Sequence, residues 1–265
     1  MAQYDNRYAQ AGVGARTDVA VDEGLRAYML RVYNYMAAGI ALTGVVAYII
    51  FTYSVTSDPA LAAGTGGRVL ALHRGMYLTP FGQTLFATPL MWVVALAPLG
   101  FVFFLSWRIY KMSVGTAQLM FWLFAAVMGA SLSSIFLRYT ATSITQVFFV
   151  TAAAFGSLSL YGYTTKKDLS GWGSFLIMGL FGVIIAALVN LFLQSSALQF
   201  AISVIGVLVF AGLTAYDTQR IKDGYFEVMG DATATAKAAI MGALNLYLDF
   251  INMFVMMLQL FGNRD

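Results

Sequence analysis

The sequence predicts an all-α, polytopic membrane protein that folds as a bundle of seven transmembrane helices. Hydrophobic residues make up 60% of the 265 residues and charged residues only 10%, whereas roughly a quarter of an ordinary soluble domain is charged. The apolar residues gather in seven charge-poor runs, each long enough to cross about 30 Å of hydrocarbon as a helix. Seven such helices leave no room for a separate catalytic domain.

The seven predicted helices are separated by short connections except after the first. The longest connection, 54–84, holds Gly64-Thr65-Gly66-Gly67 and the breakers Pro59 and Pro80, which predicts a flexible loop. The helices themselves are predicted at 33–53, 85–107, 114–137, 143–164, 172–193, 198–218 and 238–261.

Four of these runs carry signals for shape or packing. Pro89 and Pro98 each remove a backbone donor from the second run, so that helix is expected to bend. Small residues at four-residue spacing allow close approach of helices in lipid. They occur as Ala125, Gly129 and Ser133 in the third run, Gly182 and Ala186 followed by Asn190 in the fifth, and Ala211 with Ala215 in the sixth.

Residues 1–26 are predicted to form a polar N-terminal tail, and residues 27–265 the transmembrane domain. The tail interleaves arginines with acids and has no apolar core, so it is not a cleaved signal peptide. Basic residues concentrate on the cytoplasmic side of membrane proteins. Alternate connections place eleven of the fifteen on the side of the N-terminus, which predicts a cytoplasmic N-terminus in a bacterial inner membrane. These are Arg7, Arg16, Arg26, Arg31, Arg108, Lys111, Lys166, Lys167, Arg220, Lys222 and Lys237, against Arg68, Arg74, Arg138 and Arg264.

Composition excludes several kinds of site. The chain has no cysteine and one histidine, His73, in the long predicted loop. Disulfides, thiolate metal sites, histidine zinc cages and serine–histidine dyads are therefore excluded. The net charge of +3 follows from residues that set orientation in the bilayer, so it does not indicate a nucleic-acid partner. No cofactor is expected.

The last two runs carry the residues that indicate function. Asn245, Asp249 and Asn252 are spaced i, i+4 and i+7, so they form one polar stripe on a helix. A charge at the bilayer centre costs about 3 kcal/mol on insertion scales, so an acid there predicts a functional site with a partner. Asp217 is the other acid within a predicted helix.

Asp217 and Asp249 lie on consecutive helices that are expected to be antiparallel neighbours. If the first helix continues to Lys222 and the second begins near Met241, the acids differ in depth by about 5 Å and can touch. If instead the first helix ends at 218 and the second begins at 238, the two carboxyl groups are too far apart to touch.

Two carboxyl groups in contact at low dielectric cannot both ionise cheaply, so they share one proton. Loss of that proton leaves two like charges, which favours separation of the helices or entry of a cation. Oxygen ligands from Asp217, Asp249, Asn245 and Asn252, with Asn190 as a further candidate, suit a hard ion such as Ca²⁺ or H⁺ in transit. The alternative is purely structural: each acid pairs with a base such as Arg220, Lys222 or Arg108, or accepts a hydrogen bond from Tyr216 or Tyr247. Arg108 is also a candidate latch at the inner mouth.

Two pairs of segments carry a resemblance to a known family. Phe210–Lys222 and Ala243–Asn252 strongly resemble the Bax inhibitor-1 family, the transmembrane BAX inhibitor motif proteins. Ser131–Phe136 and Ser159–Leu169 look like its bacterial branch, and the match covers about 27–263. The resemblance implies a seven-helix bundle with the last helix central, and a pH-sensitive Ca²⁺ leak whose paired acids correspond to Asp217 and Asp249. It also implies stress tolerance and regulation of membrane-protein quality control.

Two other functions compete with an ion pathway. An aspartyl intramembrane protease also pairs two acids on consecutive helices, but here the second acid lies in Tyr247-Leu248-Asp249-Phe250 rather than in a glycine-rich Gly-x-Gly-Asp, and no Pro-Ala-Leu occurs. We therefore expect no enzymatic activity. A non-transporting regulator would bind other membrane proteins, such as a membrane protease, through its polar N-terminal tail.

Overall fold

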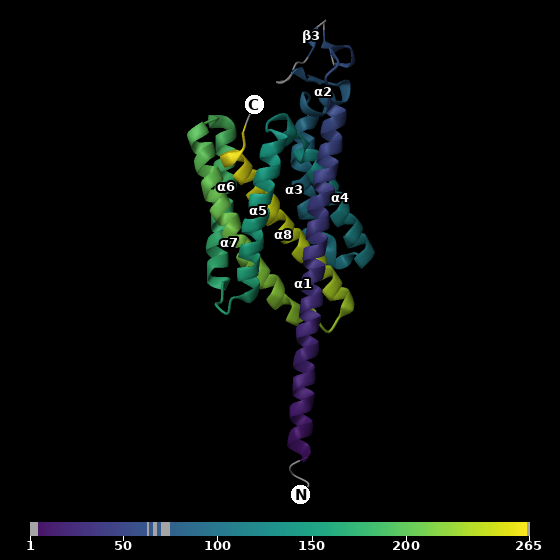
Figure 1. The fold of residues 1–265 in the computed structure, drawn as a ribbon, viewed down its shortest axis with the longest axis vertical. Coiled ribbons are helices and arrows are strands. Elements are labelled where there is room, and N and C mark those ends of the chain that lie inside the picture. Colours follow the sequence, from purple (N-terminus) through teal and green to yellow (C-terminus); the bar gives the residue numbers. More distant parts are fainter. Residues whose placement is uncertain (1–4, 63, 66–67, 70–74, 264–265) are drawn as a thin grey trace.

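The computed structural model describes residues 5–62, 64–65, 68–69 and 75–263, with side chains described over 21–62 and 75–263. Helices dominate its architecture (Figure 1). In chain order the elements are α1 (Asp5–Ser54), β1 (Val55–Thr56), η1 (Pro59–Leu61), β2 (Gly64–Thr65), β3 (Arg68–Val69), β4 (Tyr77–Leu78), α2 (Pro80–Phe86), α3 (Leu90–Arg108), η3 (Ile109–Lys111), α4 (Val114–Leu132), η4 (Ser133–Leu137), α5 (Ala141–Thr164), α6 (Ser170–Leu193), α7 (Ser196–Val228) and α8 (Ala232–Phe261).

Seven of the described helices are long and apolar enough to cross a membrane: α1 from Val21, and α3 to α8. This confirms the predicted class. Most of them turn large apolar side chains outward, including Phe192 at 89% exposure and Phe103 at 74%. Such a surface is stable only against lipid.

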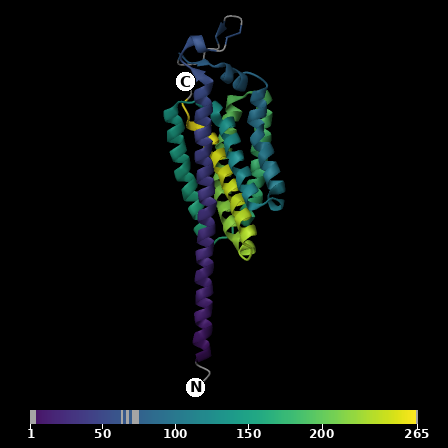
Figure 2. The same ribbon diagram turned by 90° about the vertical axis from the view of Figure 1, so that its right-hand side faces the viewer.

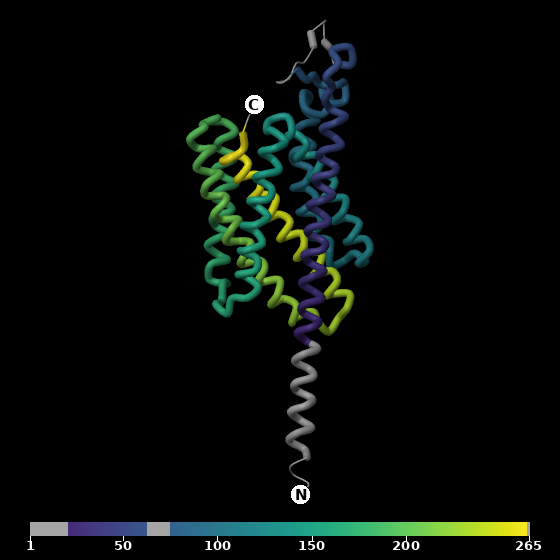
Figure 3. Tube along the Cα trace, in the orientation of Figure 1, coloured from purple at the N-terminus to yellow at the C-terminus, as the bar shows by residue number. Residues whose placement is uncertain are grey.

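Helix α8 is the centre of the bundle, as the family resemblance implied. Within the most apolar window of α8, 67% of residues are buried, against 11% to 39% in the other six spans. It packs against α1, α4, α5 and α7. It crosses the bundle obliquely (Figure 1), and the turned view shows it alongside α1 (Figure 2). Followed from residue 21, α1 starts at the end of the bundle opposite the C-terminal end of α8 (Figure 3).

Short polar residues fix where the helices begin. The hydroxyl groups of Thr79, Ser113, Thr140 and Ser195 cap α2, α4, α5 and α7, and the Asp231 carboxylate accepts from two backbone N–H groups at the start of α8. These caps satisfy donors that have no partner inside the helix.

Several predicted boundaries were wrong. The first helix begins at Asp5 rather than 33, so residues 5–26 of the predicted tail are helical, while residues 1–4 lie outside the described part. The sixth predicted helix continues to Val228 and the seventh begins at Ala232. The second predicted run is divided: Pro89 precedes α3 as its N-cap, and only Pro98 lies inside that helix.

The predicted loop at 54–84 contains short elements in its described part. Strands β1 and β4 pair antiparallel, with Val55 opposite Leu78, and β2 pairs with β3. Pro59 and Pro80 start η1 and α2 rather than breaking a helix, because proline is tolerated in a first turn. Gly66, Gly67 and His73 lie outside the described residues.

Candidate functional site

The site lies where α7 and α8 pack side by side. Three residues, 229–231, separate the two helices, so they run antiparallel. A Cβ atom added to Gly242 would lie 3.0 Å from Ile221 Cγ2, and one added to Gly206 would lie 3.1 Å from Met256 Cγ. The absence of side chains at these glycines lets the helices approach closely on both sides of the acids.

Asp217 and Asp249 meet at this contact. Their carboxyl groups lie within hydrogen-bonding reach of each other. Asp249 is 4% exposed and Asp217 is half-buried. A carboxylate only accepts hydrogen bonds, so a bond between the two requires a proton on one of them. The structure thus brings together the two acids that the sequence singled out.

The Oδ2 atom of Asp249 stands apart from the rest of the interior. Among the described residues it is the buried side-chain nitrogen or oxygen that lacks a hydrogen-bond partner. A proton carried by Asp249 itself would turn this oxygen into a donor toward the Asp217 carboxylate. Burial without a partner is costly, so this atom marks a site that a purely structural role does not explain.

Nearby basic residues do not neutralise the pair directly. Arg220, one turn beyond Asp217 on α7, attracts that carboxyl group electrostatically but is itself exposed. Lys222 donates its Nζ hydrogen to the Tyr163 carbonyl at 3.1 Å. Arg108 is exposed at the end of α3, with its guanidinium carbon 5.9 Å from the Trp107 ring centre. The latch role of Arg108 remains a prediction.

The residues of the predicted polar stripe on α8 differ in burial and in hydrogen bonding. Asn245 and Asn252 are half-buried, and Asn252 donates to the Leu248 carbonyl of its own helix at 2.8 Å. No group of three or more His, Cys, Asp or Glu side chains able to hold a metal occurs in the described part of the chain. Two carboxyl groups suit a passing cation better than a resident one.

A chain of hydroxyl groups beside Asp217 was not predicted from the sequence. Tyr33 Oη lies 2.6 Å from Ser159 Oγ, which lies 2.9 Å from Thr218 Oγ1. Thr218 donates to the Thr214 carbonyl, so Ser159 donates to Thr218 and Tyr33 donates to Ser159. The chain ties α1 and α5 to the residue that follows Asp217.

A second contact that the sequence did not predict lies two residues before Asp249. Tyr247 is fully buried, and its hydroxyl lies 2.6 Å from Thr43 Oγ1 on α1. Thr43 also contacts the Gly39 and Ala125 carbonyls, each at 2.9 Å. These hydroxyls gave no sequence signal, because serine and threonine in helices most often bond to their own preceding turn.

The turn between α5 and α6 is fastened to α7 near Asp217. Gln219 accepts from the Leu169 N–H and donates to the Lys167 carbonyl, both at 2.8 Å. In the same turn, hydrogen bonds from the side chain and backbone N–H of Ser170 hold the pKa of the exposed Asp168 carboxyl below its usual range.

An amide network closes the opposite end of the bundle. Gln199 accepts from Asn190 at 3.0 Å and donates to Gln259 Oε1 at 2.6 Å, and Ser203 donates to the same oxygen at 2.8 Å. Asn190 therefore belongs to this network and not to the acid pair.

Known proteins match this chain over most of its length. A family model described as "Inhibitor of apoptosis-promoting Bax1" matches residues 25–265. The chain is 45% identical to a protein of Caulobacter vibrioides over the full length of both, and 46% identical to one of Rickettsia prowazekii over 92% of each. It is 43% identical to inner membrane protein YbhL of Escherichia coli, over 91% of this chain and 93% of that one.

Proposed function

Because the chain belongs to the Bax inhibitor-1 family of membrane proteins, we propose that it provides a pH-sensitive pathway for cations, Ca²⁺ among them. The gate is the proton shared by Asp217 and Asp249. The protein is not an enzyme in this proposal. It acts on H⁺ and Ca²⁺ as the species that it binds and passes.

The observation that carries the proposal is the buried carboxyl pair between two helices, with one oxygen lacking a donor. With the proton present, a hydrogen bond joins α7 to α8 and the pair carries at most one negative charge. Without it, two like charges face each other at low dielectric. The repulsion is relieved when the helices separate or when a cation enters between the carboxylates. Cation passage is therefore expected to fall as the pH falls.

The same helix contact explains why the two acids act as a unit. Gly242 and Gly206 bring α7 and α8 close on both sides of the pair, so any movement of one helix changes the carboxyl separation. Thr43 and Tyr247 join α8 to α1 next to the pair. In this proposal the contacts at the two glycines and at Tyr247 stay in place, and only the hydrogen bond between Asp217 and Asp249 forms or breaks.

We place the protein in a bacterial inner membrane, with its N-terminus in the cytoplasm. The location follows from its likeness to an inner membrane protein of Escherichia coli, and the orientation follows from the distribution of basic residues.

Flux measured on purified protein in liposomes tests the proposal. The wild type should pass Ca²⁺ at a rate that rises with pH. In Asp249→Asn the amide donates to Asp217 whatever the pH, so flux should become low and independent of pH. Asp223→Asn, the same change at an exposed position on α7, is the matched control and should respond as the wild type does. A normal pH response in Asp249→Asn would refute the proposed gate.

A labelled transmembrane peptide incubated with the same preparation addresses the protease alternative. Cleavage that disappears on mutating either acid would replace the ion pathway with aspartyl protease chemistry.

A further inference from the structure

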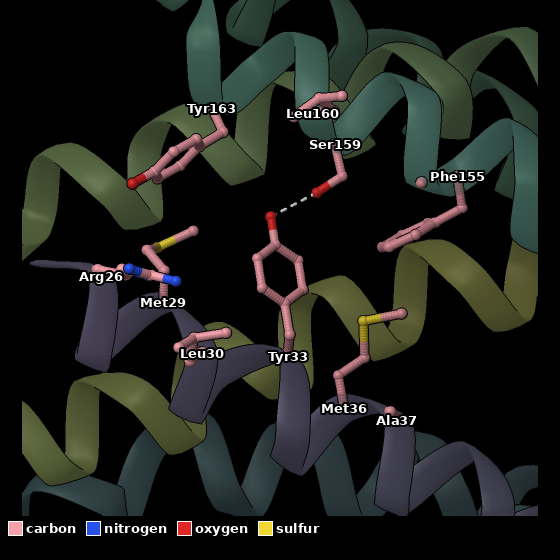
Figure 4. A pocket seen from close by; sticks show the side chains of 11 residues that line it. Arg26, Met29, Leu30, Tyr33, Met36, Ala37, Phe155, Ser159, Leu160 and Tyr163 are labelled. Carbon is pink, nitrogen blue, oxygen red and sulfur yellow. Dashed lines mark hydrogen bonds between the residues drawn. The ribbon is translucent and has the colours of Figure 1, made fainter.

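A lateral groove separates α1 from α5 on the N-terminal side of the bundle (Figure 4). Its volume is about 510 Å³. Arg26 and Tyr163 stand at one end, Tyr33 and Ser159 lie in the middle, and Phe155 lies at the other end. The groove does not include either aspartate.

The length of the groove matches one leaflet of a bilayer. On α1 the lining runs from Arg26 to Ala37, eleven residues or about 16 Å at 1.5 Å per residue. Half of a hydrocarbon core of about 30 Å is about 15 Å. A hydrocarbon chain that lies along this lining from Arg26 to Ala37 therefore has about the length that spans one leaflet.

The walls of the groove suit a hydrocarbon chain. Met29, Met36 and Phe155 are buried at its base, while Leu30 and Leu160 stand exposed at its rim at 52% and 62%. The hydroxyl groups of Tyr33 and Ser159 bond to each other. An apolar occupant therefore leaves neither hydroxyl without a partner.

The end of the groove nearest the start of α1 carries a basic side chain, Arg26. Arg26 is exposed and forms no ion pair with any described side chain. A guanidinium group attracts a phosphate and binds it through several N–H donors. We propose that the groove binds one acyl chain of an anionic phospholipid, with the headgroup phosphate held by Arg26. This binding is independent of the proposed ion pathway.

Native mass spectrometry of the full chain tests the proposal, with phosphatidylglycerol and phosphatidylcholine of identical acyl chains supplied in equal amounts. The wild type should retain one phosphatidylglycerol in preference to phosphatidylcholine. Arg26→Gln should reduce that preference about fivefold, as expected of one basic residue near anionic headgroups. Arg31→Gln, the same change at a neighbouring exposed residue outside this groove, is the control and should keep it.

Variants that fill the groove provide a second test in the same experiment. A Cβ atom added to Gly156 meets nothing within 4 Å, so Gly156→Leu adds a side chain at the groove with no clash at Cβ and should reduce retention of both lipids about tenfold. Gly182→Leu adds the same atoms at an equally open position on α6 and should change nothing. Ala37→Leu narrows the groove from α1 and should act as Gly156→Leu does.

Four results would overturn the proposal. These are equal retention of the two lipids by the wild type, unchanged retention in both groove-filling variants, an equal loss in Arg31→Gln and Arg26→Gln, or a lipid-free dimer in which a second copy covers the groove.

Discussion

The bond between Thr43 and Tyr247 predicts an unequal response to two substitutions that each remove one hydroxyl. The Thr43 hydroxyl lies 2.9 Å from the Gly39 and Ala125 carbonyls, which only accept. Thr43 therefore donates to a carbonyl, and Tyr247 is the donor in the 2.6 Å bond between the two hydroxyls. Tyr247→Phe removes that donor and leaves Thr43 satisfied, whereas Thr43→Val leaves a fully buried tyrosine hydroxyl without an acceptor.

The sizes of the two effects follow from this difference. Loss of an ordinary hydrogen bond costs about 1 kcal/mol in unfolding free energy, while an unsatisfied buried group costs about 2 kcal/mol. Replacing both residues leaves no unpaired tyrosine hydroxyl, so the unfolding free energy of the double variant Thr43→Val/Tyr247→Phe should fall by about 1.5 kcal/mol. It should therefore be more stable than Thr43→Val alone. The coupling of about 1.5 kcal/mol lies at the upper end of values for hydrogen bonds between transmembrane helices.

Reversible unfolding of the purified protein in mixed micelles, followed as denaturing detergent is added, measures these differences. Thr52→Val is the matched control, because Thr52 is exposed on the same helix and donates to the Tyr48 carbonyl of its own preceding turn. It should shift the unfolding free energy by less than about 0.5 kcal/mol. The reasoning is refuted if the double variant is less stable than Thr43→Val by the full cost of Tyr247→Phe.

Three further predictions concern the packing of α5 against α7, the amide network and the N-terminal tail. A Cβ atom at Gly162 would collide with the Ala215 carbonyl oxygen, so Gly162→Ala should destabilise the protein by about 1–3 kcal/mol in the same unfolding assay, while Gly156→Ala on the same helix should not. Gln259→Leu removes the acceptor shared by two donors and should cost about 1–3 kcal/mol; an unchanged unfolding midpoint would show that the network is not needed. Deletion of residues 1–24 should leave pH-dependent flux intact but abolish capture of a membrane protease if the tail is the binding segment, and a loss of flux would contradict an independent gate.

The number and order of the spans could be predicted because hydropathy measures the environment of a helix. Its limits appear on α7 and at the start of α1. Residues after Asp217 include Arg220, Lys222 and Asp223, which end the apolar run at 218, yet the helix continues to Val228. A helix persists wherever its backbone bonds are made, in lipid or in water. Hydropathy therefore marks where a chain enters lipid, not where its helix ends.

The contact of the two acids could be proposed from the sequence, but helix lengths alone do not produce it. From Asp217 to the end of α7 is about 17 Å, and from the start of α8 to Asp249 is about 26 Å. Parallel axes would leave them about 9 Å apart in depth. Their carboxyl groups nevertheless interact, and α8 runs at an angle through the bundle (Figure 1). That angle depends on packing against four other helices, and no local pattern encodes it.

Among the described residues, one buried side-chain oxygen lacks a hydrogen-bond partner, Oδ2 of Asp249. An amide at this position would stabilise the fold better than the acid does. An asparagine at 249 would donate to Asp217 and remove the unpartnered Oδ2. Asp249→Asn is therefore expected to raise the unfolding free energy by about 1 kcal/mol while it removes the pH response of flux. Stability gained together with response lost is the combination that a strained functional site predicts. If the variant is instead destabilised by several kcal/mol and still responds to pH, the carboxyl pair supports the fold and the gate lies elsewhere.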